Sequence, residues 1–142
     1  AEDVIDQAET LGGLEAKPCP TKTLQIHGWS QQDISERHLR PYGADVRQIR
    51  RLLKSGSDLD EKVHGDLSFR RGEVIWHVRE EMARTVEDVL ARRTRSLLLN
   101  AKASIEAAPT VAELMASELN RDEAWIQDQV GVFTELAEGY RF

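Results

Sequence analysis

Cysteine is almost absent from this chain of 142 residues, since Cys19 is the only one. A single cysteine can form neither an intrachain disulfide nor a cysteine-based metal cluster, so stability has to come from a hydrophobic core. Lone free thiols are typical of reducing compartments, and we therefore expect a cytoplasmic protein. Cys19 lies between two prolines with no evident base beside it, which favours a plain linker thiol over a nucleophile.

Long apolar runs and excess positive charge are also missing. No run approaches the roughly 18 apolar residues of a membrane-spanning helix, and the N-terminus lacks the features of a signal peptide. We therefore expect no membrane insertion by this segment. The net charge of −6 argues against a dedicated nucleic-acid surface, which usually carries a basic excess.

Motifs for cofactors and metals are missing as well. No G-x-G-x-x-G follows an expected strand, and there is no P-loop, so nothing predicts a cradle for a pyrophosphate. The four histidines do not have a metal-ligand spacing, and each is expected at or near the surface: His27, His38, His64 and His77. The sequence thus predicts no catalytic, cofactor-binding or metal-binding residue in this chain.

What is present is helical periodicity, strongest between Glu73 and Leu99. Apolar residues recur there at four-residue steps and form one stripe, which two further residues widen. The stripe consists of Val74, Val78, Met82, Val86 and Leu90, with Ile75 and Val89 beside it. This pattern predicts a helical face that is buried against other helices.

The same segment carries a capping signal at Thr85. The Thr85 hydroxyl can accept from the Asp88 amide, while the Asp88 carboxylate can accept from the Thr85 amide in return, a variant of the capping box. We therefore expect a new helix to start at Thr85, with a bend there. Charges of alternating sign also lie four residues apart at Glu80, Arg84, Asp88 and Arg92. They would form a ladder if the helix ran straight, each exposed pair adding about 0.2–0.5 kcal/mol.

Helical stripes and caps recur along most of the chain, while the best strand signal, residues 23–26, is short. Asn100 is a candidate N-cap, Pro109 should start a separate helix, and Asn120 should start the last one. Besides the central pair, we expect helices over residues 1–11, 33–39, 46–53, 100–107, 109–119 and 120–138. The fold class is all-α, a compact bundle of about six helices.

The central segment resembles a known family. It is similar to the C-terminal domain of the FAD-dependent, aerobic-type glycerol-3-phosphate dehydrogenases and alpha-glycerophosphate oxidases, in which a helix EV-x-x-x-VR-x-EMA precedes TVEDVLARRTR. The matching residues are Glu73, Val74, Val78, Arg79, Glu81 to Ala83 and Thr85 to Arg95. Tyr42-Gly43 looks like the YG element of the family, and residues 101–119 look like its next helices. The resemblance covers about residues 26–136.

The resemblance implies a detached C-terminal domain of a larger flavoenzyme. That parent would oxidise sn-glycerol 3-phosphate to dihydroxyacetone phosphate with FAD and pass electrons to a quinone, or to oxygen in the oxidase branch. FAD would belong to the parent, this chain would be inactive alone, and its partner would be the N-terminal FAD domain of the same polypeptide. Residues 1–25 would be the remnant of the last flavin-domain helix plus a linker, and residues 26–142 the helical domain. Self-association through surfaces left bare would be expected, and the parent could lie peripherally on the cytoplasmic membrane.

One constellation could contact a phosphate or the flavin domain, namely Arg92, Arg93 and Arg95. Guanidinium groups bind phosphate oxygens bidentately. The stronger interpretation is structural, because cations in the last turn of a helix favour its negative dipole end and can pair with Glu81 and Asp88. We group Glu81, Arg84, Thr85 and Asp88 as residues of structural ion pairs and the cap.

Two other classes of function remain open. The bend at Thr85, with arginines behind it, superficially suits a helix-turn-helix module that binds DNA or protein, although the acidic balance counts against DNA. A small stand-alone enzyme is the other, and it would require a pocket joining Arg92 or Arg93 to a histidine with a perturbed pKa.

Overall fold

The structure is a computed structural model that describes residues 2–141, and there the chain is all-α, as predicted. Two short 3₁₀ segments, Pro20–Lys22 and Arg37–Asp45 (η2), and one π-helical segment, Asp88–Arg93 (η3), add to the α-helices. The six α-helices are α1 (Glu2–Gly12), α2 (Val46–Leu53), α3 (Arg71–Arg79), α4 (Ser96–Leu99), α5 (Ala101–Leu119) and α6 (Glu123–Glu138). Residues 23–26, the best strand signal, form a turn and an irregular segment.

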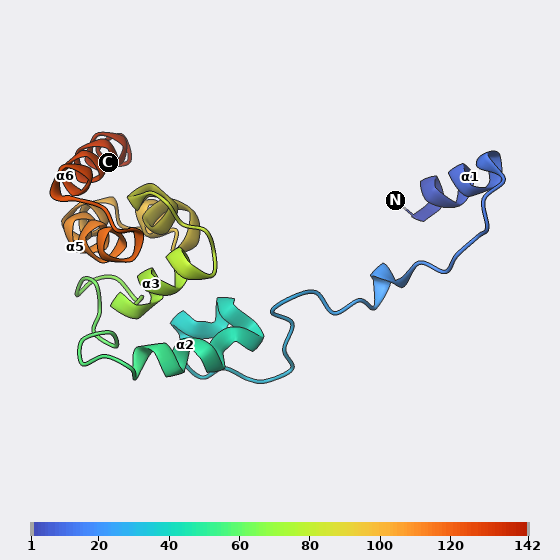
Figure 1. Ribbon diagram of the computed structural model, residues 1–142, viewed down its shortest axis with the longest axis horizontal. Helices are drawn as coiled ribbons and strands as arrows, with labels where there is room; N and C mark the ends of the chain where they lie inside the picture. The colour runs from blue at the N-terminus through green and yellow to red at the C-terminus, as the bar shows by residue number, and fades with distance from the viewer. Residues whose placement is uncertain (1, 142) are drawn as a thin grey trace.

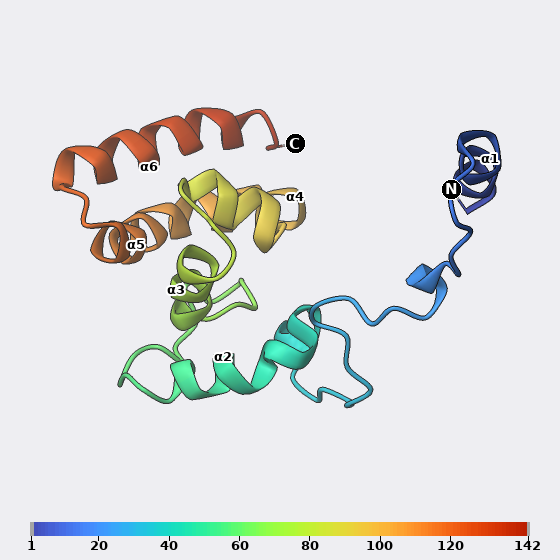
Figure 2. The same ribbon diagram turned by 45° about the vertical axis from the view of Figure 1, so that its right-hand side comes forward.

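The helices stack in sequence. α2 packs on α3, α3 on α5, and α5 on α6, so α2 and α6 lie on opposite sides of the helical body (Figure 2). α1 lies apart from this body at the end of an extended segment, and none of its residues is buried (Figure 1). The compact bundle expected from the sequence is thus formed by the chain that follows this segment.

The larger hydrophobic core surrounds α5. Small residues on α5 allow α3, η3 and α6 to approach it closely, and Phe133 from α6 is 1% exposed there. Most of the stripe predicted between Glu73 and Leu99 contributes to this core. The fully buried residues of the larger core include Val74, Val86, Val89, Leu90, Ala108, Val111, Ala112, Met115 and Ala137.

A second, smaller core holds η2 and α2 against α3. Val46, Ile49 and Leu53 form the buried face of α2, whose bounds agree with the predicted helix over residues 46–53. The Trp76 side chain from α3 closes this core. The helix predicted over residues 33–39 is wrong in position, because the helical turns begin at Arg37 and continue through Pro41.

The central helix ends earlier than its stripe predicts. α3 stops at Arg79, and Met82 has a left-handed backbone (φ 55°) and a side chain that is 74% exposed. The prediction that Met82 belongs to the buried stripe is therefore wrong. The chain reverses here instead, and the Ala83 amide donates to the His77 carbonyl at 2.9 Å.

The bend near Thr85 is present, with the predicted reciprocal contacts. The Asp88 amide donates to Thr85 Oγ1 at 3.1 Å, and the Thr85 amide donates to Asp88 Oδ2 at 3.0 Å. Because the helix does not run straight, only the last step of the charge ladder forms, between Asp88 and Arg92. The segment that follows is π-helical, and Thr94 Oγ1 donates to the Val89 carbonyl at 2.9 Å near its end.

Two predicted helix starts near the C-terminus are wrong. Pro109 lies inside α5, which runs unbroken for 19 residues. Asn120 ends α5 with a left-handed backbone (φ 52°), and the cap of α6 is Asp122, whose Oδ1 accepts from the Trp125 amide at 3.0 Å. The predicted cap at Asn100 is confirmed, since its Oδ1 accepts from the Ala103 amide at 3.0 Å.

Gly43 forms a kink inside η2, and its substitution tests how closely η2 packs on the backbone of Gly28. It has φ 51°, and a Cβ there would lie 1.8 Å from the carbonyl oxygen of Gly28, which also accepts from the Ala44 amide. We expect Gly43→Ala to destabilise the protein by about 2 kcal/mol or more, since left-handed strain alone costs about 1–2 kcal/mol. Urea unfolding followed by circular dichroism measures this. In the control Gly131→Ala, an open helical position, the stability should rise by up to about 1 kcal/mol.

Candidate functional site

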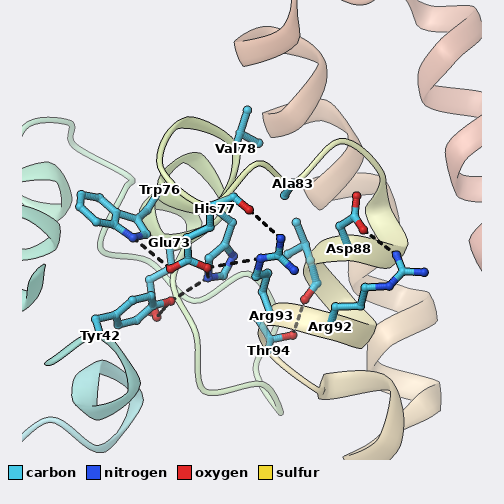
Figure 3. A network of polar contacts seen from close by, with 12 residues as sticks. Tyr42, Glu73, Trp76, His77, Val78, Ala83, Asp88, Arg92, Arg93 and Thr94 are labelled. Carbon is cyan, nitrogen blue, oxygen red and sulfur yellow. Dashed lines mark hydrogen bonds and ion pairs between the residues drawn. The ribbon is translucent and has the colours of Figure 1, made fainter. Parts of the chain in front are cut away.

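A buried polar cluster lies where η2 meets α3 (Figure 3). Glu73 and His77 stand one helical turn apart on α3, and each is only 1% exposed. Tyr42 from η2 reaches both of them. Polar groups at this depth are costly unless they are hydrogen-bonded, so their partners decide what the cluster can do.

Glu73 is the acceptor at the centre of the cluster. Its Oε1 accepts from the Arg70 amide at 2.8 Å and lies 2.7 Å from Nδ1 of His38. Its Oε2 accepts from the Tyr42 hydroxyl at 2.9 Å. Burial raises the pKa of Glu73, while these three hydrogen bonds and the His38 charge act to lower it.

His77 continues the chain of hydrogen bonds. Its Nε2 lies 2.8 Å from the Tyr42 oxygen, and the two rings are stacked with centroids 6.0 Å apart. The single hydroxyl proton of Tyr42 is donated to Glu73, so His77 Nε2 must be the donor in its contact with the Tyr42 oxygen. Nδ1 of His77, which has no partner among the described residues, is then an unprotonated acceptor, the less costly state.

The environment keeps both rings neutral. Burial, helped by the positive charge of Arg93, lowers the pKa of His77 to about 3. Burial and the nearby Glu73 carboxylate raise the pKa of the Tyr42 hydroxyl far above its ordinary value. At neutral pH His77 and Tyr42 therefore belong to a hydrogen-bond network and do not form an acid–base pair.

A cavity of about 510 Å³ opens beside this cluster. Glu81 forms part of its wall, where its carbonyl accepts from Arg93 Nη2 at 2.6 Å and its Oε2 lies 3.5 Å from Arg93 Nε. Trp76 Nε1 donates to Glu81 Oε1 at 3.2 Å. Burial nevertheless raises the pKa of Glu81. Arg37, Phe69, His77, Arg93 and Leu99 are among the other lining residues.

The three arginines singled out in the sequence do not act together. Arg93 joins the cluster, whereas Arg92 turns to the Asp88 and Glu87 carboxylates at 2.5 and 2.6 Å. Arg95 has a left-handed backbone (φ 56°) and is exposed. Arg84, expected in an ion pair, instead donates to the carbonyls of Val78 and Ala83 at 3.0 and 2.8 Å.

Sequence reasoning missed the network itself. His77 was expected at or near the surface, and that expectation is wrong, because α3 is covered on one side by α5 and on the other by α2. The sequence offered one signal: Glu73 and His77 are four positions apart, a spacing that places both side chains on the same face of a helix. That face lies beside the apolar stripe, and the two polar side chains are buried because α2 and α5 cover both sides of α3.

The geometry limits the two other function classes. Arg93 and His77 do share a cavity, the arrangement that a stand-alone enzyme would need, but a histidine with a pKa of about 3 is a poor base at neutral pH. For the helix-turn-helix interpretation, the second element is a single π-helical segment whose Arg92 is held by carboxylates. Among residues 2–141, no group of three or more His, Cys, Asp or Glu is placed to hold a metal.

The sequence of this chain matches one protein-family model and several curated relatives. The family model described as the C-terminal domain of alpha-glycerophosphate oxidase matches residues 7–126. The mitochondrial glycerol-3-phosphate dehydrogenase of Rattus norvegicus is 28% identical over 157 residues, which cover 96% of this chain and 21% of that protein. The glycerol-3-phosphate dehydrogenase of Synechocystis sp. is 24% identical over 145 residues, covering 90% of this chain and 26% of that protein.

This chain thus spans about a fifth to a quarter of the length of these relatives. No solved structure matches it. In the part of the chain that the structure describes, no helix is both long and apolar enough to cross a membrane.

The network predicts a cost for removing the Tyr42 hydroxyl. In Tyr42→Phe, the buried His77 N–H loses its acceptor and Glu73 loses one donor, so stability should fall by about 1–3 kcal/mol. Urea unfolding at pH 7 measures this. Tyr140→Phe, at a side chain 41% exposed, is the matched control and should change stability by less than about 0.5 kcal/mol. Equal effects of the two changes would contradict a stabilising network.

His77 also predicts a pH dependence. Its pKa of about 3 in the folded protein lies below the unfolded value of about 6.5, so the unfolded chain takes up the proton first. The stabilisation is complete above about pH 6.5 and is lost as the pH falls towards 3. The raised pKa of Glu73 acts with the opposite sign, because there the folded protein takes up the proton first.

Comparison with His77→Gln separates the two groups. Removing the imidazole should reduce the slope of the unfolding free energy against pH by about 1.4 kcal/mol per pH unit between about pH 4 and 6. Urea titrations at several pH values measure both slopes. Identical slopes in the two proteins would show that His77 is not kept neutral by burial.

Proposed function

We propose that this chain is the helical accessory domain of a glycerol-3-phosphate dehydrogenase. The chain belongs to the family described as the C-terminal domain of alpha-glycerophosphate oxidase. The observation that carries this proposal is the family match over residues 7–126, with relatives of that name matching nearly the whole chain. The parent enzyme would oxidise sn-glycerol 3-phosphate to dihydroxyacetone phosphate and pass the electrons to a quinone.

FAD would carry the redox chemistry of the parent, as the family resemblance implies. The residues of this chain do not fit that cofactor: within residues 2–141, no strand leads into a glycine-rich turn that could cradle a pyrophosphate. The carboxylate and hydroxyl groups of the buried Glu73–Tyr42–His77 cluster are occupied by hydrogen bonds within the chain. We therefore assign no catalytic step to this chain and expect it to be inactive alone.

The contribution of this chain would be to pack against the N-terminal FAD domain of the same polypeptide. α1 supports this, because its Val4, Ile5 and Leu11 side chains are 66%, 58% and 89% exposed and need a partner surface. We propose that residues 1–25 belong with the flavin domain and its linker, and residues 26–142 form the helical domain. Among the arginines, Arg95 is the most available for docking or for a phosphate, since Arg92 and Arg93 have carboxylate partners.

The location of the parent is a further part of the proposal. The relatives include mitochondrial and bacterial enzymes. A quinone acceptor would lie in a membrane, so the parent would work as a peripheral protein on the cytoplasmic face. Any membrane contact of that kind would be supplied by the flavin portion.

Complementation in trans tests the proposal. The N-terminal flavin portion of the parent is purified, and FAD retention and glycerol-3-phosphate-dependent dye reduction are measured with and without this chain. We expect both to rise on addition of this chain. Both should remain unchanged on addition of Gly43→Ala under conditions in which circular dichroism shows that this variant is unfolded. Two folded fragments that neither bind nor change each other's activity would contradict a supporting role.

A further inference from the structure

Charge is distributed very unevenly over this acidic protein. Residues 37–54, which contain η2 and α2, carry six basic residues and one acidic residue, Asp45. Residues 101–138, which contain α5 and α6, carry eight acidic and two basic residues. These two segments lie on opposite sides of the helical body, with α3 between them (Figure 2). The molecule therefore has a basic side and an acidic side.

The basic side is the outer face of α2. Arg47 and Arg51 on α2, and Lys54 as its C-cap with a helical backbone, are exposed and follow one another at steps of four and three residues. They therefore form one stripe opposite the buried face of the helix. Arg50 is bound to Glu36 at 2.6 Å, but none of the three stripe residues has an ion-pair partner within residues 2–141. This stripe is hereafter called the α2 basic stripe.

The acidic side includes the outer face of α6. Asp128 and Glu135 are exposed, seven residues apart, and have no ion-pair partner in the described part of the chain. Between and beside them lie Val132 and Leu136, apolar side chains that are 57% and 37% exposed. These four residues form the α6 acidic stripe, which combines carboxylates that have no ion-pair partner within residues 2–141 with exposed apolar surface.

The two stripes match in spacing as well as in charge. Arg47 and Lys54 are seven residues apart, as are Asp128 and Glu135, and both separations equal about 10.5 Å along a helix. Arg51 falls opposite Val132 in this register, where the alkyl stem of the arginine can cover the valine. Opposed helices with this pattern pair their charges at both ends and bury apolar surface in the middle.

We propose that the α2 basic stripe of one molecule docks on the α6 acidic stripe of a second copy of this chain. The two stripes cannot meet within one molecule, because α3 and α5 separate them. Each contact leaves one stripe free on each copy, so the assembly is head-to-tail and grows with concentration. This proposal stands on the charge pattern and does not require the flavoenzyme function.

Sedimentation of the 142-residue chain tests the proposal over a range of concentrations. We expect the weight-average mass to rise with concentration beyond that of a dimer at about 0.02 M salt, and to return towards the monomer at about 0.3 M salt, where charges are screened within several ångströms. A mass that stays monomeric at low salt, or an association that salt does not weaken, would overturn the proposal and leave the stripes to another partner.

Charge reversal identifies the surfaces. Arg47→Glu/Arg51→Glu and Asp128→Lys/Glu135→Lys should each abolish association alone, since like charges would then face each other. Mixed in equal amounts, the two variants should associate again, because each reversed stripe then meets a stripe of opposite charge. Circular dichroism confirms that both variants are folded.

Matched controls separate this from a general effect of net charge. Lys17→Glu/Lys22→Glu and Glu9→Lys/Glu15→Lys change the net charge by the same amounts on the exposed N-terminal segment. They should reduce the association constant by less than twofold. A loss of association in these controls as large as in the stripe variants, or no recovery on mixing, would overturn the assignment of the two stripes.

Discussion

The Glu73 carboxylate is the interaction on which the rest of this structure depends. It is almost completely buried, and its three donors come from the residue before α3, from His38 and from Tyr42. Two of these donors belong to η2, so the carboxylate ties the small core of η2 and α2 to the helix that packs on the large core. A buried acceptor with three donors has strict geometry, and this fixes one arrangement of the two cores where apolar contacts alone would allow several.

The reversal of the chain after α3 completes this arrangement. The exposed, left-handed Met82 lets the chain turn back, and the Thr85–Asp88 cap starts the next segment in a new direction. As a result, Arg93 comes within reach of Glu81 and beside His77. The charge of Arg93 then assists burial in keeping the imidazole neutral, and the neutral imidazole can donate to Tyr42 without an uncompensated buried charge.

Much of the fold could be predicted because it follows from local chemistry. The apolar stripe of α2, the Asn100 cap and the Thr85–Asp88 pair each depend on residues within one or two turns of each other. The errors arise where distant packing decides. Pro109 stays inside α5 because the buried face of this helix continues on both sides of it, from Ala103 to Ala116. Met82 leaves the stripe because the chain reverses there. The role of Tyr42 depends on a contact 35 residues away in sequence, which no local pattern reveals.

The polar cluster also bears on what kind of domain this is. A site that moves protons at neutral pH needs groups with pKa values near 7, whereas burial here moves the pKa of His77 down to about 3 and that of Tyr42 upwards. These two displacements are away from the working range of an acid or base, whereas burial raises the pKa of Glu73, and all three follow from the packing of η2 against α3. The same burial that would disable catalysis makes the hydrogen bonds strong and directional. A network of this kind fits a domain whose contribution is a rigid surface of defined shape, and in the proposed flavoenzyme that surface would be offered to a partner domain that carries the chemistry.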